Sequence, residues 1–445
     1  MKNILKNRKA NDWYISGSGN FDAKLNGNDN SHFKQLRKES LNQLSQTDFP
    51  TLKTEEWKYT NLNKILSEDF VHASSVEKQM LLEKDISSFS SENFDNHLLV
   101  FINGIFSAEL SELSDLPKNV FVGSLSEGLK LKDEIVKDHL DKLFKNKTAF
   151  DHLNSSYIID GFFAFIPDGT VLEKPIQILN ISGHSSELTF NTPRNLILAG
   201  KNSQATIIEK YIGVEGSKYF TNCASEIFVD ENAIVDLYKI ELENENSFHI
   251  GRTEVIQREK SVFSHYNFSF GGSIVRNDIN SKLDGENIEC NFNGLYIGKN
   301  DQHLDNHTFI DHAKPNCLSN ELYKGILDDN SHGVFSGKIL VDKDAQKTNA
   351  YQSNKTILLS EDSSIDTKPQ LEIYADDVKC SHGATIGHLD ETALFYILSR
   401  GIPEEKAKSM LITAFAEDVV SKVKIKPLQD KLNHLIFEHL NRVEI

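Results

Sequence analysis

Residues 371–387 read Leu371-Glu372-Ile373-Tyr374-Ala375-Asp376-Asp377-Val378-Lys379-Cys380-Ser381-His382-Gly383-Ala384-Thr385-Ile386-Gly387, and they divide this 445-residue chain into two kinds of sequence. The long region before them has the texture of short strands, and the region after them is helical. If residues 378–383 are extended, the side chains of Cys380 and His382 leave the backbone on the same face. A thiolate beside an imidazole is half of a soft metal site, so the other ligands have to come from elsewhere.

The region before this stretch has a regular repeat. From Tyr157 to Ile386, short runs of Ile, Val, Phe and Tyr alternate with polar turn clusters, and from Asp230 onward the clusters recur every 13–15 residues. A β-sandwich has strands at a spacing of about 8–12 residues and less regular loops. The repeat favours a β-solenoid, whose coils stack and whose alternate side chains fill a narrow interior. Because the repeat is degenerate in residue identity, a sandwich is the competing interpretation.

The flanking regions read as helical, so the sequence predicts a mainly β protein with three domains. We expect a mixed, mostly helical N-terminal domain at residues 1–150, a β-helix core at 151–388 and a C-terminal helical domain at 389–445. Within the first domain, apolar spacing predicts helices over 33–44 and 127–150, and the Gly- and Ser-rich residues 17–31 predict a flexible loop. Residues 54–62 contain Trp57 and Tyr59, and we expect an amphipathic surface segment that packs both side chains; the alternative is a binding role for the two aromatics.

The C-terminal domain carries clear signals for helix ends. Asp390 is a good N-cap, and Gly401 stands where a glycine ends a helix. Pro403 and Pro427 are expected to open two further helices. The unit is too small to be a catalytic domain, so it is expected to cap the open end of the solenoid or to form a docking surface.

Composition excludes several classes of function. The chain has 48 Lys and Arg against 65 Asp and Glu, a formal charge of −17 at pH 7, which argues against binding to nucleic acid or to an anionic membrane. No run approaches the roughly 20 apolar residues of a membrane span, and the N-terminus does not resemble a secretory signal. Four scattered cysteines without C-x-x-C spacing indicate reduced thiols and a cytoplasmic protein. Three of them are expected to be core residues, namely Cys223, Cys290 and Cys317.

A second candidate metal site lies in residues 301–312. If this segment is extended, His303, Asp305 and His307 share one face and His312 lies on the other. The three histidines are therefore candidate metal ligands, weaker ones than the pair described above. The alternative is a hydrogen-bonded polar ladder on the outer face of the solenoid. Cys380 and His382 have the corresponding alternative of a buried thiol beside a hydrogen-bonded imidazole. Neither a phosphate-binding loop nor a nucleophile elbow occurs in the chain.

Several stretches together resemble the SufB/SufD family, the scaffold subunits of the SUF iron–sulfur cluster assembly machine. They are residues 302–312, Tyr323-Lys324-Gly325, Phe335-Ser336-Gly337-Lys338-Ile339, Asp344-Ala345-Gln346-Lys347-Thr348, residues 365–371 and 378–387, Ala393-Leu394-Phe395-Tyr396 and Arg400-Gly401-Ile402. The segment Thr54-Glu55-Glu56-Trp57-Lys58-Tyr59-Thr60-Asn61-Leu62 and the low cysteine count are similar to the SufD branch rather than the SufB branch.

The resemblance implies a fold and a place in a complex. It implies a right-handed parallel β-helix between the two helical domains, a heterodimer with a SufB-like paralogue through the β-helices, and a SufC-like ATPase docked on the C-terminal helices. It places a nascent, transient iron–sulfur cluster at the dimer interface, with a histidine that matches His382 and lies close to Cys380. It also implies a non-catalytic scaffold that aids iron entry, in a complex associated with reduced flavin, although the sequence shows no flavin motif.

Other functions stay open from the sequence alone. The chain could be a SufB-type paralogue that itself accepts sulfur and carries the cluster, or a β-helix structural adaptor without metal chemistry. A β-helix polysaccharide lyase or hydrolase would need an extracellular signal, and none is visible. A homodimer is expected to be possible when the partner is absent.

Overall fold

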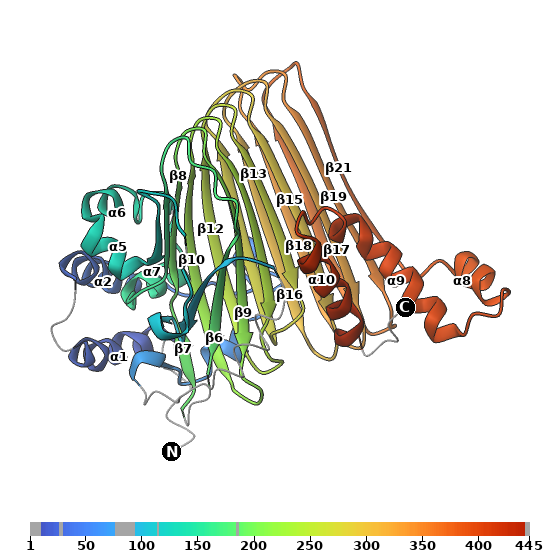
Figure 1. The fold of residues 1–445 in the computed structure, drawn as a ribbon. Coiled ribbons are helices and arrows are strands. Elements are labelled where there is room, and N and C mark those ends of the chain that lie inside the picture. The colour runs from blue at the N-terminus through green and yellow to red at the C-terminus, as the bar shows by residue number, and fades with distance from the viewer. Residues whose placement is uncertain (1–9, 26–29, 76–93, 114, 184–186, 441–445) are drawn as a thin grey trace.

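A parallel β-helix built of two sheets forms the centre of the computed structural model (Figure 1). The structure describes residues 10–25, 30–75, 94–113, 115–183 and 187–440. Sheet A has 11 strands: nine follow the order β20-β18-β16-β14-β12-β10-β8-β5-β4, and β7 and β1 branch from β10. Sheet B has 10 strands in the order β21-β19-β17-β15-β13-β11-β9-β6-β2-β3. Consecutive strands of the core alternate between the two sheets. Within a sheet, each strand pairs in parallel with the strand one coil further along the chain. The expected parallel β-helix is therefore confirmed, and the sandwich is wrong.

The strands of the two sheets are given by their bounds. Sheet A contains β1 (Val71–His72), β4 (Phe121–Ser124), β5 (Phe162–Ile166), β7 (Thr189–Asn191), β8 (Arg194–Ala199), β10 (Tyr219–Val229), β12 (Phe248–Gln257), β14 (Ile274–Leu283), β16 (His303–His312), β18 (His332–Val341) and β20 (Ser364–Ile373). Sheet B contains β2 (His97–Ile102), β3 (Ile105–Phe106), β6 (Ile176–Ser182), β9 (Gln204–Gly213), β11 (Ile234–Leu242), β13 (Val262–Ser269), β15 (Glu289–Gly298), β17 (Leu318–Leu327), β19 (Asn349–Leu358) and β21 (Lys379–Gly387).

The polar clusters seen in the sequence are the corners of the β-helix. Each coil has one strand in each sheet, so the predicted period corresponds to half a coil. Register partners lie a full coil apart, as Ile274 and His303 do. Many corners contain a residue in the left-handed region with φ between +51° and +61°, mostly the asparagines that tolerate it. These residues are Asn202, Asn232, Lys260, Asn287, Asn300, Asn316, Asp329 and Lys347.

Alternate side chains of the strands fill the interior, as the period of a strand requires. Cys290 and Cys317 lie in this apolar core with 0% exposure, and Cys223 is buried at 4%. The expectation that these three cysteines are core residues is confirmed. Their burial raises the pKa of each thiol, to about 11 for Cys223, which leaves all three protonated at neutral pH.

N-terminal helices cover the outer face of sheet A at one end of the β-helix (Figure 1). They are α1 (Ala10–Lys24), α2 (Ser31–Leu44), α3 (Asn63–Leu66), α5 (Leu125–Leu131), α6 (Asp133–His139) and α7 (Ala149–Ser156). The predicted loop at 17–31 is wrong as far as Lys24, because burial of Tyr14 and Phe21 holds that sequence in a helix; its residues 26–29 lie outside the described part. Residues 1–9, from which the sequence predicted that there is no secretory signal, also lie outside the described part.

The helix expected over 127–150 is also wrong. The segment forms α5 and α6, and α7 starts only at its end. Lys132 leaves the helical region between the first two, and Asp141 and Asn146 have φ of +65° and +52°. Thr148 then opens α7 with a capping box that includes Asp151.

The C-terminal helices are α8 (Glu391–Leu398), α9 (Glu404–Val420) and α10 (Lys426–His439). The side chain of Asp390 caps α8 as expected, and Gly401 has a φ of +82°. Pro403 is the N-cap of α9, one position before the expected one, and Pro427 lies in the first turn of α10. Among the described residues, no helix has the length and apolar character needed to cross a bilayer.

Helices α9 and α10 lie flat on the outer face of sheet B rather than across its end (Figure 1). Ile412 and Val419 from α9 and Leu432 and Ile436 from α10 share one apolar cluster with strand residues such as Leu295. The expectation that this domain caps the solenoid is wrong for the described residues, because its apolar faces pack on the side of the sheet. Within the described ranges, no segment covers the last coil.

Candidate functional site

Cys380 and His382 lie on β21, which is the edge strand of sheet B. They are register partners of Ala350 and Gln352, whose side chains point into the β-helix, so both candidates point toward its interior as well. Cys380 is half-buried against the end of the apolar core, whereas His382 is exposed. Partial burial raises the pKa of the Cys380 thiol, so its ionisation would have to accompany metal binding. The predicted shared face is confirmed.

The last coil exposes both the edges of the sheets and the end of the core. Strands β20 and β21 are the final strands of their sheets, over 10 and 9 residues. The core residues Ile365, Leu371 and Val378 are only half-buried here. Large apolar side chains are exposed around them on the last coil, namely Ile373, Tyr374 and Ile386. An uncovered parallel edge next to uncovered apolar side chains is a surface built for pairing with another chain.

The site is incomplete as a metal site. Within the described part of the chain, no group of three His, Cys, Asp or Glu side chains is arranged to hold a metal ion. Cys380 and His382 provide one sulfur and one nitrogen donor, a set that suits iron and sulfide chemistry but leaves coordination positions open. Cys380 and His382 alone therefore do not complete a metal site, and further donors would be needed to hold a metal centre.

The second candidate site has a different environment. His303 and His307 lie on the outer face of sheet A, whereas His312 is buried inside and contacts the Ser319 hydroxyl at 2.8 Å. His303 Nδ1 is 3.0 Å from His332 Nδ1, and its Nε2 is 2.8 Å from Thr60 Oγ1. These ring nitrogens already have partners. The structure keeps His303 and His307 on one face with Asp305, as expected, with His307 Nε2 3.0 Å from Asp305 Oδ1, and it places His312 on the other face. These contacts form the hydrogen-bonded ladder that was the alternative interpretation.

Residues 54–62, here called the strap, cross this ladder and hold it in place. Trp57 is 5% exposed, and the guanidinium carbon of Arg276 lies 3.7 Å from its ring centroid. Arg276 also contacts Asp305 at 2.8 Å, and Thr60 donates to Asp305 at 2.5 Å. At the far end of the strap, Glu55 is paired with Lys368 on β20. The strap therefore links the N-terminal region to the last coil, and the expected packing of Trp57 is confirmed.

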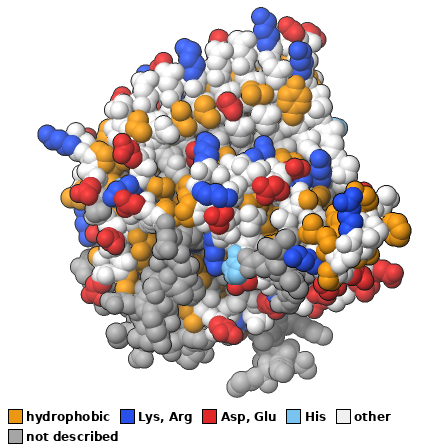
Figure 2. Space-filling view, turned by 45° about the vertical axis from the view of Figure 1, so that its right-hand side comes forward, with side chains coloured by type: hydrophobic (Ala, Val, Ile, Leu, Met, Phe, Trp, Pro, Cys, Tyr) orange, Lys and Arg blue, Asp and Glu red, His pale blue; other side chains and the backbone are white. Residues whose placement is uncertain are grey.

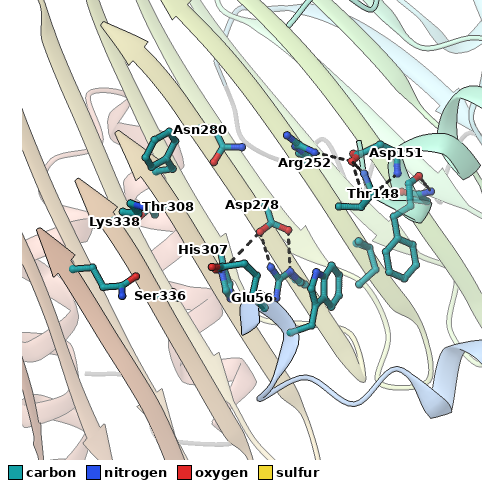
Figure 3. A pocket seen from close by; sticks show the side chains of 17 residues that line it. Glu56, Thr148, Asp151, Arg252, Asp278, Asn280, His307, Thr308, Ser336 and Lys338 are labelled. Atoms are coloured by element: carbon teal, nitrogen blue, oxygen red, sulfur yellow. Dashed lines mark hydrogen bonds and ion pairs between the residues drawn. The ribbon is translucent and has the colours of Figure 1, made fainter. Parts of the chain in front are cut away.

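A cavity of about 320 Å³ lies beside the strap on the outer face of sheet A (Figure 3). Its cations are already paired with acids: Arg252 with Asp151 at 2.6 Å, and Arg276 with Asp278 at 2.8 Å. Burial and these acids leave no cationic group of the arginine pair free for an anionic ligand. The cavity is a structural seam between the strap, α7 and the sheet.

Helix α8 stands away from the body of the protein (Figure 1). None of its residues is buried, and the exposed fractions of Phe395 and Tyr396 are 73% and 57%. Figure 2, which brings this side forward, shows hydrophobic side chains at the surface among charged ones. The sequence identified this helix, but only the structure shows that its apolar residues have no cover.

Comparison with known proteins finds matches over most of the chain. Residues 181–415 match the family model described as "SUF system FeS cluster assembly, SufBD core domain", and residues 9–178 match "SufBD protein N-terminal region". An iron–sulfur cluster assembly SufBD family protein of Synechocystis is 32% identical over 93% of this chain and 92% of its own length. The iron–sulfur cluster assembly protein SufD of Escherichia coli is 31% identical, with 88% and 89% covered. The chloroplastic protein ABCI7 of Arabidopsis thaliana is 30% identical, with 90% and 85% covered.

Proposed function

This chain belongs to the SufBD family of iron–sulfur cluster assembly proteins, and on that premise we propose that it acts as a SufD-type, non-catalytic scaffold subunit. The observation that carries the proposal is the incomplete pair of donors, Cys380 and His382, on the uncovered last coil. A subunit that shares a metal site with a partner has to present an incomplete set of ligands on the surface that meets the partner. The likeness to relatives named SufD supports the choice of branch.

The partner at the open end is proposed to be a SufB-like paralogue. Its β-helix would meet β20 and β21, cover Ile365, Leu371 and Val378, and bring further ligands toward His382. The nascent cluster is then the cargo held between the subunits, with His382 as a ligand and Cys380 as a second candidate. A contribution to iron entry and an association with reduced flavin remain predictions from the family resemblance.

A SufC-like ATPase is proposed to dock on the C-terminal helices. Support comes from the exposed Phe395 and Tyr396 on α8 and from the attachment of α9 to the β-helix. Lys324 is 3% exposed and pairs with Asp418 of α9 at 2.5 Å. This charge-assisted contact would pass a movement of the helices to β17 in sheet B. The four free thiols fit the reducing cytoplasm that we propose as the location.

Co-purification tests the assembly. The full chain is expected to retain the SufB and SufC homologues of the same organism. The variant Phe395→Ala with Tyr396→Ala leaves α9 and α10 in place on sheet B, and it is expected to lose SufC while retaining SufB. Retention of SufC by this variant would contradict the docking proposal, and failure of the full chain to retain SufB would contradict the role of the open end.

Replacement of His382 tests the ligand role. In a strain that depends on this chain, His382→Ala should abolish cluster maturation, whereas His388→Ala, an exposed histidine just beyond β21, should not. Maturation that survives His382→Ala would support the adaptor without metal chemistry. A stable, stoichiometric cluster on the isolated chain after anaerobic reconstitution would instead favour the SufB-type paralogue.

A further inference from the structure

A buried polar pair lies directly beneath His382 inside the β-helix. Phe292, Glu321, Gln352 and His382 are register partners on β15, β17, β19 and β21. Side chains in such a row point to the same face and follow one another at about 4.8 Å. Phe292 belongs to the apolar core, but Glu321 and Gln352, each 3% exposed, replace the expected apolar stack with a carboxyl and an amide.

The amide of Gln352 has one satisfied and one unsatisfied end. Its Nε2 donates to Glu321 Oε2 at 2.7 Å. Its Oε1 is buried and has no hydrogen-bond partner among the described residues. A buried amide oxygen without a partner costs free energy, so a donor is expected to reach it. Gln352 lies between Glu321 in the preceding coil and His382 in the last one, and with its nitrogen turned to Glu321, its oxygen is available to the side of His382.

The surroundings fix the orientation of this amide. Glu321 Oε2 accepts the hydrogen bond from Gln352 Nε2 on one side. Across the interior, Gly337 makes the space for Gln352, because a Cβ atom at Gly337 would lie 2.4 Å from Gln352 Nε2 and 2.9 Å from Thr308 Oγ1. This clamp of Glu321 and Gly337 holds the nitrogen end of the amide, so the free oxygen points away from Glu321.

We propose that Gln352 is a positioning residue for His382, and that its Oε1 accepts a hydrogen bond from one ring N–H of the imidazole. The other ring nitrogen then carries the lone pair and faces the open end, where the proposed function places the metal. Histidine ligands commonly donate their second N–H to an acceptor that fixes tautomer and ring orientation. The tautomer part of the proposal concerns the isolated chain, while its consequence for cluster assembly rests on the proposed function.

The tautomer of His382 in the isolated chain provides the test. The chain is labelled with ¹⁵N-histidine, and the His382 signals are identified by their loss in His382→Ala. Gln352→Met keeps the length of the side chain and removes the acceptor, so the ratio of the two neutral tautomers is expected to change about fivefold, as for the loss of one hydrogen bond. Asn354→Leu is the matched control, since Asn354 is a fully buried amide on the same strand whose register partner is Ala384.

An unchanged ratio in Gln352→Met, or an equal change in Asn354→Leu, would overturn the proposal. If Gln352→Met does not fold, Glu321→Gln provides a second variant, because it loosens the clamp and is expected to shift the same ratio. In the complex with the SufB homologue, Gln352→Met should lower cluster assembly about tenfold. A tautomer shift without that loss supports the hydrogen bond and contradicts His382 as a ligand, whereas the loss without a shift overturns the positioning role.

Discussion

The two ends of the β-helix are built in opposite ways. At the N-terminal end, sheet B finishes with β3 and sheet A with β4, short antiparallel strands of 2 and 4 residues. Phe106, Leu116 and Val120 pack on the core there. At the C-terminal end, sheets A and B finish with the long parallel strands β20 and β21 and with half-covered core residues.

The difference shows that one β-helix can prevent strand pairing at one end and leave it possible at the other. Short edge strands and a change of direction are standard devices that prevent further pairing. The chain uses them at one end only, among the residues that the structure describes. The uncovered strand edges are therefore specific to the C-terminal end of the β-helix, and the candidate ligands lie at this end.

The largest expected effect is a difference between a charge at the closed end and the same charge at the open end. Leu99→Asp places a carboxylate at a position with 0% exposure in β2 and should lower the free energy of unfolding by about 4 kcal/mol or more. Leu371→Asp on β20 should cost about 1–2 kcal/mol, because its side chain already reaches solvent. Chemical denaturation measures both, and equal costs would remove the distinction between the ends.

The same pair of variants should behave differently in assembly. Leu371→Asp folds but is expected to lose the SufB homologue in co-purification. Normal retention by this folded variant would show that the open end is not the contact surface.

The strap offers a way to loosen the open end from a distance. Arg276→Ala leaves Asp278 and Asp305 without their buried cation and Trp57 without its stacked guanidinium. Breaking a buried pair costs about 3–5 kcal/mol. Hydrogen exchange should speed up in β20, which the strap reaches through Glu55 and Lys368. The exposed Arg258→Ala is the control and should cost about 1 kcal/mol or less.

Acid should destabilise the closed body of the protein through its buried histidines. Burial lowers the pKa of five of them to about 3 or 4, so these histidines stay neutral in the folded state while the unfolded chain takes up protons below about pH 6.5. They are His72, His265, His303, His312 and His439. Their folded pKa values are depressed, so stability is lost as the pH falls from about 6.5 toward 4.

Three buried carboxyls act in the opposite direction. Burial raises the pKa of Asp160 to about 6 and those of Glu209 and Glu321 to about 7. Above about pH 4.5 these carboxyls bind protons more tightly in the folded state than in the unfolded chain, so they add stability as the pH falls toward 4.5. The five histidines outnumber the three carboxyls, so these eight groups together lower the free energy of unfolding as the pH falls from about 6 to 5. Denaturation at several pH values measures the slope. His265→Gln should flatten it, and Ser269→Ala should not; a flat wild-type profile would contradict the assignment.

The smallest expected effect on stability comes from a proline on the open edge. Lys379 N–H donates toward β19, and alternation along the strand turns the Ala384 N–H outward. Ala384→Pro should therefore change the free energy of unfolding by about 1 kcal/mol or less, yet weaken the complex with the SufB homologue. Thr385→Pro removes an inward N–H and should detach β21. A complex unaffected by Ala384→Pro would mean that the partner contacts side chains and not the strand edge.

Much of the fold could be predicted because its signals are local. The regular polar corners predicted the β-helix, and Asp390 with Gly401 predicted the limits of α8. The shared face of Cys380 and His382 followed from the period of a strand. The resemblance to the family identified the same two residues.

The remainder depends on contacts between distant residues. No local signal shows that Tyr14 and Phe21 keep a glycine-rich segment helical, or that the C-terminal helices pack on the side of sheet B. The pairs Trp57 with Arg276 and Gln352 with Glu321 join segments 219 and 31 residues apart. The alternation of β19 could have marked Gln352 as interior, but its free oxygen needed the three-dimensional structure.

The blunt N-terminal end of the β-helix has a consequence for the size of assemblies. A rod with two pairing ends adds copies head to tail and grows into a filament. A rod with one pairing end can only meet another open end, and the addition then stops at two. If the open end is the pairing surface, as proposed, the short antiparallel strands β3 and β4 at the other end would limit the rods to a pair and keep a chain rich in edge-capable strands from polymerising.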